Sequence, residues 1–141
     1  MEERQACGKL LKQINDELRK NANNAMRALD MTVAQLEVLL ELDRAPEKQR
    51  SLKELEQRLH VAQSTAAGTI ARLEQKGFVE SFGDAADRRI KLVRITPAGT
   101  DCANSAKQDM MEAEARLLSG LTETERDIFL ALLKKVRSSL G

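Results

Sequence analysis

The residues most suited to chemistry in this sequence are small, polar or basic, and they lie between residues 63 and 76. At 100° per residue, Ser64, Thr65, Gly68, Thr69 and Arg72 fall within an arc of about 140° on one side of a helix. Small residues let a helix approach base edges closely, hydroxyls donate to phosphates, and an arginine reaches a phosphate or a guanine. The pattern predicts a helix that enters a major groove. A helical hairpin with a solvated polar face would carry the same residues.

A second basic feature follows a short turn. Arg88, Arg89, Lys91 and Arg94 place four positive charges in seven residues, directly after Asp87. An arginine at a hairpin tip fits a minor groove, whose negative potential is strongest at narrow A·T stretches. Asp87 can hold such an arginine through a charge-assisted hydrogen bond. A solvated edge strand protected by charge is the alternative interpretation.

The sequence contains few of the residues that catalytic or metal-binding sites need. His60 is the only histidine, Cys7 and Cys102 are too few thiols for a zinc site, and no phosphate-binding glycine loop occurs. We therefore expect no enzyme activity, no cofactor and no metal site.

Composition indicates one globular domain with local rather than overall positive charge. The chain has 141 residues, of which 42% are hydrophobic, and a net charge of +1. Residues 51–96 hold eight basic and six acidic side chains, so only the middle third is positive. No apolar run approaches the roughly 18 residues that cross a bilayer, and the N-terminus is acidic. We expect a cytoplasmic protein.

Apolar periodicity and capping residues predict six helices, over residues 4–29, 32–44, 51–59, 63–76, 97–118 and 122–140. Two β-prone segments, 78–82 and 88–95, flank a turn-rich tip at 83–87 and form a hairpin. The third and fourth helices, joined by three residues, make a helix-turn-helix. The predicted fold is mainly α, with a two-stranded hairpin as a wing.

The wing residues resemble a signature of the MarR family of bacterial transcriptional regulators. Asp87-Arg88-Arg89, five further residues and Ile95-Thr96 match that family's Asp-x-Arg-x5-Leu/Ile-Thr pattern. Further resemblance lies in Thr32-x-x-Gln35, in Ser64-Thr65 and in residues 73–80. The resemblance implies a single domain over 1–141, with a winged helix-turn-helix at 32–96 and dimerisation helices at 1–29 and 97–141.

Two departures from the family pattern bear on the site. Ser81 and Phe82 stand where relatives often carry arginines before the wing tip, which weakens the grip on the backbone and leaves Phe82 in need of a partner. Ala62 stands where many relatives have a capping serine, a loss of about 1 kcal/mol for the helix that follows.

The resemblance implies a sequence-specific, double-stranded-DNA-binding repressor that responds to a small-molecule effector. A homodimer would bind a pseudo-palindromic operator, because the apolar first and last helices exceed what one winged helix buries. The alternatives are a winged-helix module that binds protein, a monomer, and a redox-sensing regulator that uses Cys7, although a buried structural cysteine is the commoner outcome. The expected DNA contacts are Ser64, Thr65, Gly68, Thr69, Arg72, Arg88, Arg89 and Lys91, with Asp87 supporting the wing.

Overall fold

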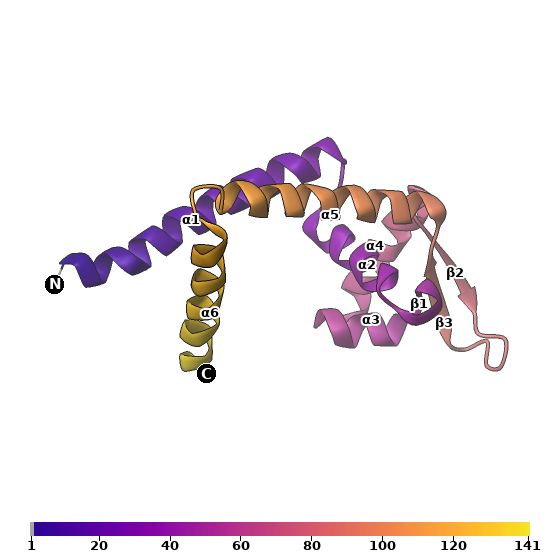
Figure 1. Ribbon diagram of the computed structural model, residues 1–141. Helices are drawn as coiled ribbons and strands as arrows, with labels where there is room; N and C mark the ends of the chain where they lie inside the picture. Colours follow the sequence, from indigo (N-terminus) through magenta and orange to yellow (C-terminus); the bar gives the residue numbers. More distant parts are fainter. Residues whose placement is uncertain (1) are drawn as a thin grey trace. The chain divides into compact units, whose positions relative to one another are not determined.

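The computed structural model describes residues 2–141, with side chains described from residue 6 onward. The chain divides into two compact units, and the boundary in the sequence lies between Gln108 and Asp109. Figure 1 labels the helices and strands. The helices are α1 (Glu2–Ala28), α2 (Val33–Asp43), α3 (Leu52–Leu59), α4 (Gln63–Gln75), α5 (Pro97–Leu117) and α6 (Glu123–Ser139). A short 3-10 turn, Pro46–Lys48, leads into the strands, which are β1 (Gln49–Ser51), β2 (Val79–Gly83) and β3 (Lys91–Ile95).

The core of the first unit lies where α2, α3 and α4 pack beside the sheet (Figure 1). Its fully buried large side chains are Leu39, Leu42, Leu55, Ile70, Leu73 and Val93. Ala66, Ile70 and Leu73 recur on one side of α4 and are buried, as their spacing predicts. The opposite side of α4 is therefore left facing solvent.

The wing is part of a three-stranded antiparallel sheet with the order β1-β3-β2. Val79 pairs with Ile95 and Phe82 with Leu92, so the predicted hairpin is confirmed. The third strand, β1, was not predicted, because three residues are too short to show an alternating pattern. The predicted strand over 88–95 was too long: β3 begins at Lys91, and Arg88 and Arg89 lie in a turn.

The helix starts follow the predicted capping chemistry. Thr32, Ser51 and Thr122 each accept a hydrogen bond from the backbone N–H three residues on, and complete capping boxes form at all three. The backbone N–H of Ser51 is the main cause of the lowered pKa of Glu54. Ala62, at the start of α4, makes no side-chain cap, as the sequence indicated.

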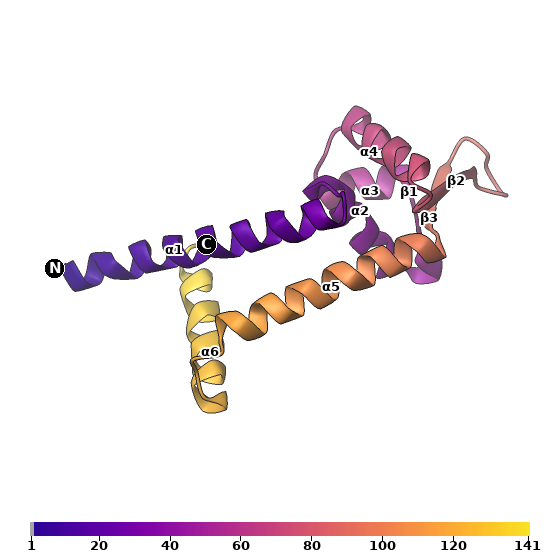
Figure 2. The same ribbon diagram turned by 90° about the horizontal axis from the view of Figure 1, so that it is seen from above.

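Both units expose apolar side chains. In the first unit, α1 presents Leu10, Leu11 and Ile14 to solvent, and α1 forms one long continuous helix (Figure 2). In the second unit, α6 exposes Ile128, Leu130, Leu132, Leu133 and Val136, and Leu140, directly after the helix, is also exposed. These exposed apolar side chains are more numerous than the single hydrophobic residues found on most protein surfaces. Clusters of this kind are typical of interaction surfaces. Among the described residues, no helix has the length and apolar character needed to span a bilayer.

The two cysteines lie in different environments. Cys102 is buried in the core, as expected, and burial raises the pKa of its thiol. Cys7 is exposed on α1, so the expectation of a buried structural cysteine is wrong for the single chain. Cys7 lies near the start of a solvent-facing helix, away from the buried core of the first unit.

Candidate nucleic-acid interface

The connection between α3 and α4 is a tight turn. His60 adopts the left-handed conformation, with φ of 54°, and the backbone N–H of Val61 donates to the carbonyl of Glu56. Leu55 of α3 and Ala66 of α4 are both buried, so the two helices are fixed against the core. This is the helix-turn-helix arrangement that the sequence predicted, with α4 as the helix available to a groove.

The exposed side of α4 brings together all five predicted contact residues. Ser64, Thr65, Gly68 and Arg72 are exposed, while Thr69 is half-buried. The Thr69 hydroxyl donates to the Thr65 carbonyl at 3.0 Å, which leaves its methyl group and both lone pairs of its oxygen for a partner. These five residues, the α4 polar face, line a shallow recess of about 310 Å³ together with Thr32 and Gln35 at the start of α2.

Gly68 is the most unusual member of the α4 polar face. A Cβ built at this position would meet nothing within 4 Å, so no packing among the described residues requires a glycine there. A glycine inside a helix costs about 0.5–1 kcal/mol relative to alanine. The open space therefore fits a partner that approaches the α4 backbone closely.

The wing tip is organised by Asp87 and Arg89. The guanidinium Nε and Nη2 of Arg89 donate to the two carboxylate oxygens of Asp87, both at 3.0 Å, and the Arg89 backbone N–H donates at 3.1 Å. The side-chain bond is the main cause of the lowered pKa of Asp87 and of the raised pKa of Arg89. The Arg89 side chain is 91% exposed, so it stays charged and projects from the protein in a defined direction.

A second recess separates the wing from the helix-turn-helix. Arg89 and Lys91 line it from the wing, and Lys53 and Gln63 line it from the starts of α3 and α4, around a volume of about 480 Å³. Lys53 and Gln63 are not among the contact residues predicted from the sequence, although Gln63 directly precedes Ser64. The structure does not bring Arg88 into this recess; it is exposed in the turn.

The fourth basic wing residue has an internal role. Arg94 donates two hydrogen bonds, at 3.1 and 2.8 Å, to the side-chain oxygen of Gln49 on β1. Its guanidinium also lies 4.7 Å from the centre of the Phe82 ring. Phe82, the departure from the family pattern, therefore has its partner within the sheet.

Metal chemistry has no site in the part of the chain that the structure describes. No three His, Cys, Asp or Glu side chains lie close enough together there to hold an ion.

Comparison with known proteins gives one family. A profile of the MarR family matches residues 29–90. The HTH-type transcriptional regulator YwaE of Bacillus subtilis is 32% identical over 80 residues, which span 57% of this chain but only 47%, about half, of YwaE.

Two solved structures share the fold over nearly the whole chain. A complex of S. aureus MepR with DNA matches with a TM-score of 0.80 and 25% identity, covering 95% of this chain and 99% of MepR. A variant of MarR from E. coli complexed with operator DNA matches with a TM-score of 0.69 and 29% identity, covering 92% and 91%. YwaE is described as a transcriptional regulator and not as an enzyme, in agreement with the expectation on activity. The match over residues 29–90 and the shared fold make this chain similar to the MarR family of winged-helix transcriptional regulators.

Proposed function

We propose that this chain is a sequence-specific regulator that binds double-stranded DNA, and that it acts as a ligand-responsive repressor. The observation that carries the proposal is the wing tip, where Asp87 fixes an almost fully exposed Arg89 guanidinium. A protein-binding module would not need an oriented, solvated arginine beside a second polar surface. The DNA complexes of MepR and MarR support the same role for this fold.

The α4 polar face would lie in the major groove. Gly68 allows the helix backbone to approach, Ser64 and Thr65 donate to phosphates or bases, and Arg72 reaches a phosphate or a guanine edge. The free methyl group of Thr69 suits contact with a thymine methyl.

The wing would occupy the adjacent minor groove. Arg89 would enter it, because the groove's negative potential attracts a guanidinium. Arg88 and Lys91 would neutralise nearby phosphates from the exposed surface of the wing. Asp87 acts as the support that orients Arg89.

A homodimer would place two such surfaces on one operator. The exposed apolar residues of α1 and α6 supply the dimerisation surface, so residues 1–29 and 97–141 serve dimerisation and 32–96 serve DNA binding. A two-fold dimer binds a pseudo-palindrome whose half-sites lie about one helical turn apart. Light scattering at micromolar concentration should give twice the chain mass of 15.7 kDa. A monomer that still binds a palindrome tightly would contradict this assignment.

Ligand response would act through the spacing of the two α4 helices. An effector that favours a spacing unsuited to the operator weakens binding about 5- to 150-fold for a coupling of about 1–3 kcal/mol. An effector that binds tightly and leaves operator affinity unchanged would remove this part of the proposal. The protein would act in the cytoplasm, where its DNA partner lies.

Two variants test the DNA contacts directly. Arg89→Ala should lower affinity for every duplex and reduce the slope of log K against log salt by about one unit for each protomer. Thr69→Ala should leave that slope unchanged and relax preference at one or two base pairs, by about 1–3 kcal/mol at most. The measurement is a salt titration of each variant on the operator and on a scrambled duplex. Parent-like binding by Arg89→Ala on both duplexes at every salt concentration would show that the wing is not a DNA contact.

A further inference from the structure

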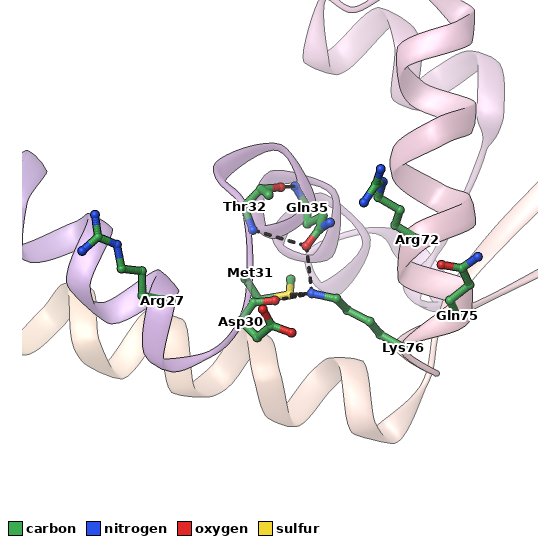
Figure 3. Close-up of a pocket in the computed structure, with 8 residues that line it drawn as sticks. All are labelled: Arg27, Asp30, Met31, Thr32, Gln35, Arg72, Gln75 and Lys76. Carbon is green, nitrogen blue, oxygen red and sulfur yellow. Dashed lines mark hydrogen bonds between the residues drawn. The ribbon is translucent and has the colours of Figure 1, made fainter.

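A third recess, the junction recess, lies where the end of α1, the start of α2 and the second half of α4 meet. It has a volume of about 410 Å³ and holds three basic side chains, Arg27, Arg72 and Lys76, against one acidic side chain, Asp30 (Figure 3). None of the DNA contacts assigned above involves Arg27. The positive balance of this recess therefore needs an explanation of its own.

Lys76 is already committed within the protein. Its ammonium donates to the backbone carbonyl of Asp30 and, at 3.1 Å, to the side-chain oxygen of Gln35, and it lies 3.6 Å from the sulfur of Met31. Figure 3 shows these contacts converging on the Lys76 nitrogen. Lys76 therefore fixes the α1–α2 junction against α4, and its hydrogen bonds are not available to a ligand.

Arg27 and Arg72, unlike Lys76, have no partner among the described residues. Both side chains are exposed, and neither forms an ion pair or hydrogen bond with any residue that the structure describes. Arg27 lines the recess from α1 and Arg72 lines it from α4, and Figure 3 shows the Arg27 side chain extending away from Lys76. Each guanidinium keeps its full set of N–H donors for an anion.

The junction recess continues the α4 polar face. Thr32, Gln35 and Arg72 line both the junction recess and the recess that holds Ser64 and Thr65. A polyanion bound along the α4 polar face would therefore contact Arg72 first, and Arg27 would be the next basic residue beyond it. The first turn of α2, which opens onto the same place, contains no acidic residue to repel it.

We propose that the DNA sugar-phosphate backbone on the edge of the major groove opposite the wing lies in the junction recess, where Arg72 and Arg27 bind successive phosphates. This inference rests on the proposed function. A DNA backbone fits better than a small apolar acid, because the recess is open and Met31 is its only apolar residue. The footprint would then extend from the wing, across α4, to the last turn of α1.

The first test compares Arg27→Ala with Arg19→Ala. Both arginines are exposed on α1, both lack a partner among the described residues, and both changes remove one charge and leave a good helix former. Arg27→Ala should reduce the affinity lost between 50 and 200 mM salt by about 12-fold, the share of two phosphate contacts, one from each protomer of the dimer. Arg19→Ala should titrate like the parent, and Arg27→Lys should keep most of the slope.

The second test locates the phosphate. Single phosphates of the operator are replaced, one at a time, by uncharged methylphosphonates, and binding is measured with the parent and with Arg27→Ala. The proposal predicts one position outside the half-site whose replacement weakens the parent and has no effect on Arg27→Ala. Replacement of the phosphate under the wing should weaken both proteins alike.

The outcomes separate this inference from the function on which it rests. If the parent binds its operator, and the Arg27→Ala and Arg19→Ala slopes are equal, the junction recess is not a backbone site, although DNA binding stands. If every methylphosphonate costs the two proteins the same affinity, the inference is likewise overturned. If the parent binds no duplex at all, the proposed function itself fails.

Discussion

Gly68→Ala should stabilise the free protein and weaken its binding to the operator. The added methyl group meets no atom within 4 Å, so it relieves the cost of glycine in a helix without a clash. The expected gain is about 0.5–1 kcal/mol. For a chain of this length, the unfolding entropy converts that gain into a rise in Tm of about 2–3 °C.

The opposite effect is expected on the operator. In the proposed complex the Gly68 backbone lies against the DNA, so a methyl group there pushes α4 away from the bases. The loss of one base contact corresponds to about 1–3 kcal/mol, or about 5- to 150-fold in Kd. Gly68→Ser, with a larger side chain, should lose at least as much.

The assay is a pair of measurements on the same preparations. Thermal unfolding without DNA gives the stability change, and fluorescence anisotropy with labelled operator and scrambled duplexes gives the affinity change. An increase in Tm with unchanged operator affinity would show that the α4 backbone does not approach DNA. A decrease in Tm would show that the space around Gly68 is not open.

Three further changes test the structural support of the site. Gly99→Ala should destabilise the fold by more than about 2 kcal/mol in urea unfolding, because a Cβ would overlap a backbone carbonyl before β2 and lie 2.7 Å from a buried side-chain carbon. Hydrogen bonding by Lys107 is the main cause of the lowered pKa of Asp43, so stability should fall as the pH drops below about 4, and Lys107→Met should flatten that fall. Phe82→Ala removes the ring beneath Arg94 and should cost about 1 kcal/mol of stability or more, while operator salt dependence stays that of the parent.

Local signals made much of this fold predictable. The capping boxes at Thr32, Ser51 and Thr122 are four-residue patterns, and each one marks a real helix start. Apolar spacing placed Ala66, Ile70 and Leu73 in the core, and the remaining side of α4 follows from that burial. The candidate contact residues on α4 could therefore be found without a structure.

Long-range charge pairing could not be predicted. Asp43 is 6% exposed and pairs with Lys48 and with Lys107, which is 64 residues away. Glu41, 9% exposed, receives the side chains of Arg50 and Arg58 from β1 and α3. Burying a carboxylate is costly unless a cation accompanies it, and no spacing in the sequence identifies which cation does so.

The error at the wing shows how a local interaction can override an apparent strand. Residues 88–95 are β-prone, yet β3 starts at Lys91, because the Asp87 carboxylate binds the backbone and side chain of Arg89 two residues on. Such a side-chain to backbone bond competes with strand pairing. In a strand, the direction of Arg89 would follow the pleat of the sheet. In the turn, Asp87 sets it, so a substitution at Asp87 should affect the aim of Arg89 while leaving the sheet that carries it in register.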